Sequence, residues 1–217
     1  MLTDITANSF ETGTDEIERF ALEECVKRHH LDRRVSVLVS PASHCELAIK
    51  FAKLGAVVTA VDRQSKQDSI KACVEKSGMI QDISCGVLEL PSIIPDELPN
   101  EPYDIIFIRY GLGHLHYEEA RQVIRQLMLK LRIGGKLYVS ILGLKSELGD
   151  GYVDAEKEVQ ERFCHLSPDL IAKYGIKGKV CLYTERNLFL LLLESGASVL
   201  RTLTTTYGNV KAVAVRV

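Results

Sequence analysis

The sequence predicts an α/β fold in which helices cover both faces of a doubly wound, mostly parallel, seven-stranded sheet with a C-terminal antiparallel hairpin. Three observations lead to this prediction. Short apolar runs alternate with helical patterns along most of the chain, as in successive βαβ units. Residues 105–108 are apolar at every position, which suits a parallel strand buried on both faces. Two β-rich runs, 197–207 and 210–217, follow each other directly and predict the hairpin, with Gly208-Asn209 as its tight turn.

Length and composition restrict the class of protein. The 217 residues suit one ordinary domain, 1–217, whose core needs neither disulfides nor metal. The net charge of -2 is not typical of a protein that binds nucleic acid or an anionic membrane. No run approaches the roughly 20 apolar residues of a membrane span, and the first residues lack a secretory signal pattern. The six scattered cysteines are typical of reduced thiols in a cytoplasmic protein, and no metal site is predicted.

The chain begins with an N-terminal helical segment, residues 1–33. Its start is polar, and Thr14 with the acidic residues after it resembles a helix cap. Apolar residues then recur at helical spacing as far as His29. This helix is expected either to pack on the edge of the sheet or to cover a ligand site.

Residues 35–62 form a βαβ unit of minimal length. A strand is expected at 35–39, a helix at 45–54 that stops at Gly55, and a second strand at 56–61. Asp62 follows at the carboxyl end of the second strand, where open α/β sheets usually hold the sugar of a nucleoside ligand. The alternative for Asp62 is a plain capping or turn aspartate.

The later elements continue the alternation. They are expected as helix 67–77, strand 79–85, strand 103–109, helix 117–131, strand 136–141 and helix 184–194. A long insertion, residues 143–182, separates the last two. A stretch of this size tends to be functional or to carry its own helices, and here helices are expected at 154–163 and from the Ser167-Pro168-Asp169 cap to Gly175.

This layout resembles the class I, Rossmann-like S-adenosylmethionine-dependent methyltransferases over about the whole chain. The LRIGGKLYVS stretch is similar to the family's turn into its fifth strand, and YDIIFIRYGLGHL to its fourth motif, with His114 keeping a family histidine. The glycine-rich first motif, however, is rewritten. The positions of its acid and three glycines hold Val39, Pro41, Ser43 and Cys45.

The resemblance implies a site for S-adenosylmethionine, with S-adenosylhomocysteine as the product. The implied cofactor-binding residues are Ser40, Pro41, Ala42, Ser43, Asp62, Arg63, Gly86, Val87, Leu88, Arg109, Tyr110 and Gly111. Val87 replaces the family acid that binds the adenine amino group, Val39 the acid near the cationic amino acid end, and Pro41 removes an N–H. Each lost contact to a charged group costs about 1.5–3 kcal/mol, so uncompensated losses weaken a micromolar site to millimolar. Compensation is expected from Ser40, Ser43, His44, Asp62 and Arg63.

Three functions remain open at this stage. The first is a methyltransferase acting on a small molecule or an unidentified acceptor, with His114 and Tyr110 as candidate catalytic residues and the insertion shaping the acceptor pocket. The second is a catalytically inactive pseudo-methyltransferase that serves as a binding or scaffolding module. The third is an α/β domain for another nucleoside or anionic ligand. A structural histidine at position 114 and surface packing of Arg109 and Tyr110 are the alternatives to their site roles, and the sequence leaves the acceptor and the oligomeric state open.

Overall fold

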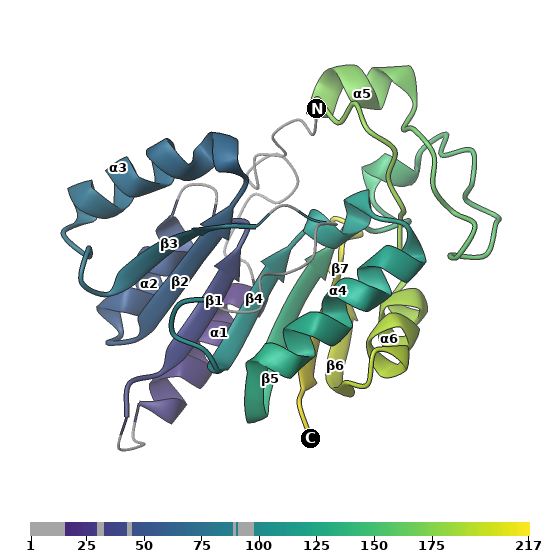
Figure 1. Cartoon of the computed structure of the whole chain (residues 1–217). Coiled ribbons are helices and arrows are strands. Elements are labelled where there is room, and N and C mark those ends of the chain that lie inside the picture. The colour runs from purple at the N-terminus through teal and green to yellow at the C-terminus, as the bar shows by residue number, and fades with distance from the viewer. Residues whose placement is uncertain (1–15, 30–32, 43–44, 89, 91–97) are drawn as a thin grey trace.

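The computed structural model describes residues 16–29, 33–42, 45–88, 90 and 98–217. Its centre is a seven-stranded sheet with the order β3-β2-β1-β4-β5-β7-β6 (Figure 1). The first five strands along the chain run parallel, and β7 is antiparallel to both β5 and β6. The strands are β1 (Ser36–Ser40), β2 (Val57–Asp62), β3 (Ile83–Val87), β4 (Tyr103–Arg109), β5 (Leu131–Ile141), β6 (Ser198–Thr204) and β7 (Val210–Val215). The predicted mixed sheet with its terminal antiparallel hairpin is therefore confirmed.

Helices cover both faces of the sheet, so the doubly wound arrangement is also confirmed. One face carries α1 (Glu16–Arg28), α2 (Glu46–Lys53) and α3 (Gln67–Ser77), and the other carries α4 (Tyr117–Lys130) and α6 (Glu185–Glu194). Side chains alternate between the two faces, as in β1, where Val37 and Val39 face α1–α3 and Leu38 faces α4. Short 3-10 helices are η2 (Gln64–Lys66), η3 (Gly111–His114) and η4 (Glu147–Gly149). Among the described residues, no helix has the length and apolar content needed to cross a membrane.

Local signals explain where several elements begin and end. The helix predicted at 67–77 forms with those bounds and ends at Gly78, whose φ of 74° is the left-handed cap that glycine favours. At the start of α6, the Thr184 hydroxyl accepts the Asn187 N–H at 3.2 Å. The β4 strand also has the predicted bounds.

The insertion corrects one prediction. Residues 154–163 form turns and no helix. The guanidinium of Arg162 binds the carbonyl oxygens of Asp154, Ala155 and Lys157, and the Phe163 N–H donates to the Asp154 carboxylate at 3.2 Å. Because these tertiary contacts use groups that a helix would bond internally, they override the helical propensity. The predicted helix after Ser167 forms as α5 (Pro168–Tyr174) and ends at Gly175.

Several β boundaries also differ from the predictions. Strand β5 begins at Leu131 and not at residue 136, and its pairing with β4 shifts register between Tyr103 and Ile105. Residues 79–82 form a turn in which the Asp82 N–H donates to the Met79 carbonyl, so β3 begins only at Ile83. The loop between β6 and β7 spans residues 205–209 and is not a two-residue turn. Its Gly208 carbonyl lies so close to Gly143 that a Cβ on Gly143 would stand 1.8 Å from it. This backbone contact fixes the start of the insertion against the hairpin.

The insertion has a small core of its own beyond the carboxyl ends of the strands, where α5 lies (Figure 1). This core, which we call the insertion core, comprises the buried residues Tyr110, Leu142, Leu148, Tyr152, Leu166, Leu170, Ile176, Val180 and Leu182. It is tied to the main domain where the Cys181 N–H donates to the Gly113 carbonyl at 2.8 Å. The insertion is therefore attached to the edge of the sheet at which β4 and β5 end.

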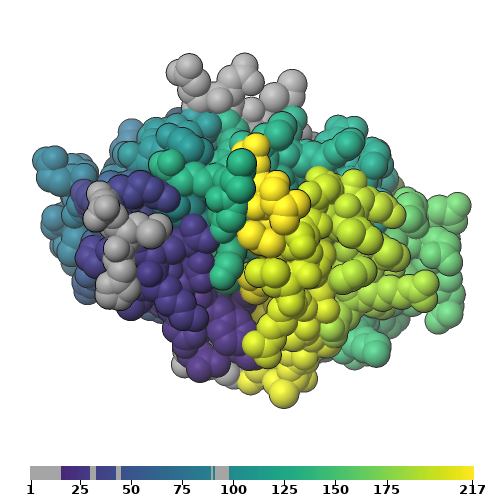
Figure 2. Space-filling model, turned by 90° about the horizontal axis from the view of Figure 1, so that it is seen from below, coloured from purple at the N-terminus to yellow at the C-terminus, as the bar shows by residue number. Residues whose placement is uncertain are grey.

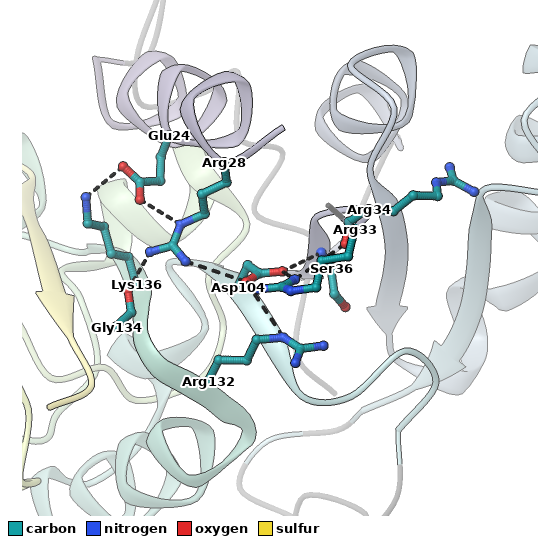
Figure 3. A network of polar contacts seen from close by, with 9 residues as sticks. All are labelled: Glu24, Arg28, Arg33, Arg34, Ser36, Asp104, Arg132, Gly134 and Lys136. Carbon is teal, nitrogen blue, oxygen red and sulfur yellow. Dashed lines mark hydrogen bonds and ion pairs between the residues drawn. The ribbon is translucent and has the colours of Figure 1, made fainter. Parts of the chain in front are cut away.

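At the opposite end of the sheet, ion pairs connect α1 to the strands. In the view of Figure 2, α1 and the segments around the start of β5 and the end of β7 lie side by side. Figure 3 shows the fully buried carboxylate of Asp104 in contact with Arg28, Arg33 and Arg132. A second carboxylate, Glu24 on α1, accepts from Arg28 and from Lys136, each at 2.7 Å. This network, which we call the Asp104 network, connects α1 to β4 and β5 at the amino ends of the strands.

Candidate functional site

The candidate site lies where four neighbouring parallel strands end. Ser40, Asp62, Val87 and Arg109 are the last residues of β1, β2, β3 and β4. Since β1 pairs with both β2 and β4, the order of strands reverses beside β1. Ligands of open α/β sheets bind outside the carboxyl ends at such a reversal. The sequence-predicted residues at these ends are thus brought to one edge.

The loop after β1 bonds to the protein itself. Pro41 has no N–H, the Ala42 N–H donates to the Val61 carbonyl at 2.9 Å, and the Cys45 N–H donates to the Ala42 carbonyl at 2.7 Å. Ser43 and His44 lie outside the described residues. None of the described amides from 41 to 45 is therefore directed at a ligand, in contrast to a glycine-rich loop.

Cys45 occupies the place where the loop enters α2. Its φ is 58°, its thiol donates to the Ile70 carbonyl at 3.6 Å, and its side chain is fully buried. Burial, followed by the neighbouring Cys73 thiol, raises the pKa of Cys45 to about 12. The thiol therefore stays protonated and fills the core beneath the loop.

Asp62 is 5% exposed and bonds locally. Its Oδ1 accepts the N–H of Arg63 at 2.8 Å. Its carbonyl accepts the Leu88 N–H at 3.0 Å and the Gln67 side-chain amide at 3.2 Å. Gln67 also donates to the Gly86 carbonyl at 2.7 Å, so it bridges the ends of β2 and β3. Sequence reasoning missed Gln67, although its place at the first position of a helix after the strand-end acid was a usable signal.

The end of β3 presents an apolar surface to the site. Val87 pairs with Asp62 in the sheet register and is 40% exposed. Leu88 instead points into the core on the α4 face. Leu90 reaches across to the end of β4, where a Cβ on Gly111 would stand 3.3 Å from its Cδ1. Leu90 therefore contacts the residue that directly follows Tyr110 at the end of β4.

Arg109 and Tyr110 lead to different parts of the molecule. The Arg109 guanidinium folds back over the Phe107 ring, 5.4 Å from its centroid, and forms an ion pair with Glu18 of α1. Tyr110 is 5% exposed, has a φ of 56° and packs in the insertion core. Its N–H donates to the Ser140 carbonyl at 2.7 Å. The end of β4 thus links α1 with the insertion.

His114 is held as a neutral imidazole. It ends η3, and its Nδ1 is buried without a hydrogen-bond partner among the described residues. Burial, and secondly the positive charge of Arg63, lowers the pKa of His114 to about 4. His116 lies against the Phe163 ring, with 3.9 Å between centroids. Within the described part of the chain, no three His, Cys, Asp or Glu side chains are grouped as a metal site.

These residues fit the nucleoside half of the expected ligand. A carboxylate ends β2, and an apolar side chain lies beside it at Val87. The loop after β1 does not supply free amides for the charged half. Any contacts to that half must come from other elements.

Known proteins resemble this chain mainly in their fold. No family model matches the sequence. A protein of Anoxybacillus flavithermus (strain DSM 21510 / WK1), named "Uncharacterized methyltransferase", is 27% identical over 108 residues, which are 45% of this chain and 51% of that protein. The chain thus spans about half the length of this relative.

Three solved structures are similar over most of the chain. A Rhodobacter sphaeroides protein, provisionally named as a Zn-dependent alcohol dehydrogenase, has a TM-score of 0.71 at 16% identity. The match covers 96% of this chain and 92% of that protein. A SAM-dependent methyltransferase of Methanosarcina mazei has a TM-score of 0.65 at 16% identity, and the match covers 88% of this chain and 97% of that protein. PigF with SAH has a TM-score of 0.61 at 13% identity, and the match covers 92% of this chain and 64% of that protein. At these identities the likeness concerns the fold.

Proposed function

We propose that this chain, which has the fold of the class I S-adenosylmethionine-dependent methyltransferases, transfers a methyl group from S-adenosylmethionine to a small-molecule acceptor. The observation that carries the proposal is the buried carboxylate of Asp62 at the end of β2, beside the reversal in strand order. The presence of SAH in PigF, which shares the fold, supports the choice of cofactor. The net charge of -2 favours a small acceptor over nucleic acid.

In this proposal the different strand ends contact different parts of the cofactor. Asp62 binds the ribose hydroxyls, Gly86–Leu88 border the adenine, and Arg63 and Gly111 border the nucleoside from either side. Ser40–Ser43 contribute side chains in place of loop amides. The bound sulfonium supplies an activated methyl group, so the protein has mainly to hold the acceptor in line with it. One domain, with the 143–182 insertion on the acceptor side, is sufficient for this, and the six free cysteines support a cytoplasmic location.

His114 is the side chain proposed to take a proton from the acceptor. It is neutral at pH 7 because its pKa is lowered to about 4, and its Nδ1 has no hydrogen-bond partner among the described residues. A lowered pKa also makes it a weak base, so it suits an acceptor that loses its proton readily. Tyr110, which is buried in the insertion core, is proposed to support the acceptor side of the site.

One observation favours a second candidate, a pseudo-methyltransferase that acts as a binding or scaffolding module. The described amides after β1 are absent or bonded internally, so the cofactor loses contacts that the family normally makes. Calorimetric titration with S-adenosylmethionine and with S-adenosylhomocysteine separates the two candidates. Micromolar binding supports the enzyme, and no heat at millimolar ligand supports the binding module.

The Asp62→Ala variant tests the site directly. We expect its affinity for S-adenosylhomocysteine to fall about 100-fold, because two charge-assisted hydrogen bonds to the ribose are lost. Asp68→Ala, an exposed aspartate on α3, is the matched control and should bind as the wild type does. Calorimetry gives the affinities, and thermal melting gives the stabilities. A large fall in melting temperature with binding intact would instead identify Asp62 as a turn aspartate.

A further inference from the structure

We propose that Glu18 and Arg109, assisted by Lys50, bind the amino acid end of the cofactor in place of the acid that Val39 replaces. This inference rests on the proposed function. It concerns residues outside the altered loop: Glu18 comes from α1, Arg109 from the end of β4 and Lys50 from α2. We call these three residues the Glu18 cluster.

The first step is the position of Arg109 relative to Val39. In the sheet register Val39 pairs with Phe107, and both side chains face α1. Arg109 lies two residues beyond Phe107 on the same face, and its guanidinium carbon is 5.4 Å from the Phe107 ring centroid. Arg109 therefore ends the strand next to that of Val39, and its guanidinium lies over the Phe107 ring that pairs with Val39.

The second step is the charge that α1 brings to this position. Glu18 forms ion pairs with Arg109 and with Lys50, the latter at 3.4 Å. The side chains of Glu18 and Arg109 are 14% and 20% exposed, so solvent screens them only partly. Lys50 is 51% exposed. One carboxylate beside two cations is complementary to a zwitterion, with the ammonium group on Glu18 and the carboxylate on Arg109 and Lys50.

The third step is that the side chains on this face of the sheet change from apolar to polar toward the ligand edge. Three neighbouring strands carry a row of large apolar side chains, followed two residues nearer the ligand edge by a polar row. The apolar row is Phe107, Tyr138 and Val213, and the polar row is Arg109, Ser140 and Lys211.

Ser140 points to a ligand at this row. It is fully buried, and its Oγ has no hydrogen-bond partner among the described residues. A buried hydroxyl without a partner is costly, so a ligand group that bonds to it compensates for that cost. Lys211, which pairs with Ser140 in the sheet register, is 1% exposed, so the row also carries a buried cation. The row therefore suits the carboxylate of an amino acid.

The Glu18 cluster also holds α1 against the sheet, and the test must separate this structural role from ligand binding. Two ligands make the separation. S-adenosylhomocysteine carries the amino acid end, whereas 5′-methylthioadenosine has the same nucleoside and thioether without it. Loss of a residue that binds only the amino acid end should weaken the first ligand and leave the second unchanged.

We expect Glu18→Gln to weaken S-adenosylhomocysteine about 10- to 100-fold in calorimetry and to change the affinity for 5′-methylthioadenosine less than about twofold. Glu23→Gln, in an exposed pair with Arg19 on the same helix, is the matched control and should change neither affinity. If Glu18→Gln does not fold, Lys50→Met replaces it, with an expected loss of about 3- to 10-fold for S-adenosylhomocysteine alone.

Other outcomes overturn the inference in distinguishable ways. Equal losses for both ligands would assign Glu18 a structural role in holding α1. Unchanged affinities for both would place the amino acid end elsewhere. A wild-type chain that binds neither ligand would overturn the proposed function itself, and this inference with it.

Discussion

Replacing Asp104 with alanine is expected to lower the free energy of unfolding by about 3–5 kcal/mol, because it removes one partner of a buried ionic network. Asp104 is fully buried, and its two carboxylate oxygens accept from Arg33 at 2.6 Å each. It also accepts the Ser36 N–H at 2.9 Å and lies within 3.5 Å of Arg28 and 3.7 Å of Arg132. Without the carboxylate, three guanidinium groups face one another at the amino ends of the strands (Figure 3).

Urea unfolding of the wild type and of two variants measures this effect. The matched control is Asp82→Ala, which removes a carboxylate from Arg34 in a pair that is 29% exposed on the aspartate side. We expect its cost to stay below about 1 kcal/mol, as for most surface pairs. Equal costs for the two variants would show that the Asp104 network contributes no more than a surface ion pair.

The pH dependence of this difference has a definite sign. Burial raises the pKa of Asp104, but the hydrogen bonds from Arg33 and Ser36 outweigh it, so the net pKa lies below the ordinary value of 3.8. A lowered folded-state pKa stabilises the protein above the unfolded-state value, and this contribution is lost as pH falls through the folded-state value. The gap in stability between wild type and Asp104→Ala should therefore be full at neutral pH and narrow below about pH 4.

The fold followed from local patterns because most of its elements depend on them. The buried run of β4 and the spacing and terminal glycine of α3 determine those elements with little help from their neighbours. Residues 154–163 have an equally helical pattern, yet Arg162 takes their carbonyl oxygens. The carbonyl groups that an arginine contacts depend on how the insertion folds over the domain. The periodicity of apolar residues in the sequence does not contain this information.

The candidate site was predictable only in part, for a similar reason. The strand ends could be located because parallel strands bring their carboxyl ends to one edge, and Asp62 could be identified there. Glu18 could not, because its approach to Arg109 depends on how α1 lies across the sheet. The internal bonds of Ala42 and Cys45 likewise depend on the folded loop, whereas the sequence showed only that the glycines were missing.

Replacing Arg162 with methionine is expected to loosen the insertion by about 3 kcal/mol while the sheet stays folded. The side chain is 6% exposed and donates to the Leu182 carbonyl at 2.8 Å and to the Asn187 side chain at 3.2 Å. It donates as well to the three carbonyls within 154–157. Hydrogen bonds from a charged donor contribute about 1.5–3 kcal/mol each, but a surface segment can relax and regain part of this from water. Methionine keeps the length of the stem and removes every one of these donors.

Amide hydrogen exchange shows where the loss falls. The Cys181 and Tyr183 N–H groups, which donate to Gly113 and Leu142, should exchange faster in Arg162→Met, while those of β1 and β4 stay protected. Arg186→Met, an exposed arginine on α6, is the matched control and should leave all of them unchanged. Faster exchange throughout the sheet would mean that Arg162 supports the whole domain. A loss confined to the insertion would mean that this segment opens independently at the edge where the acceptor is proposed to bind, so that its closure can respond to that acceptor.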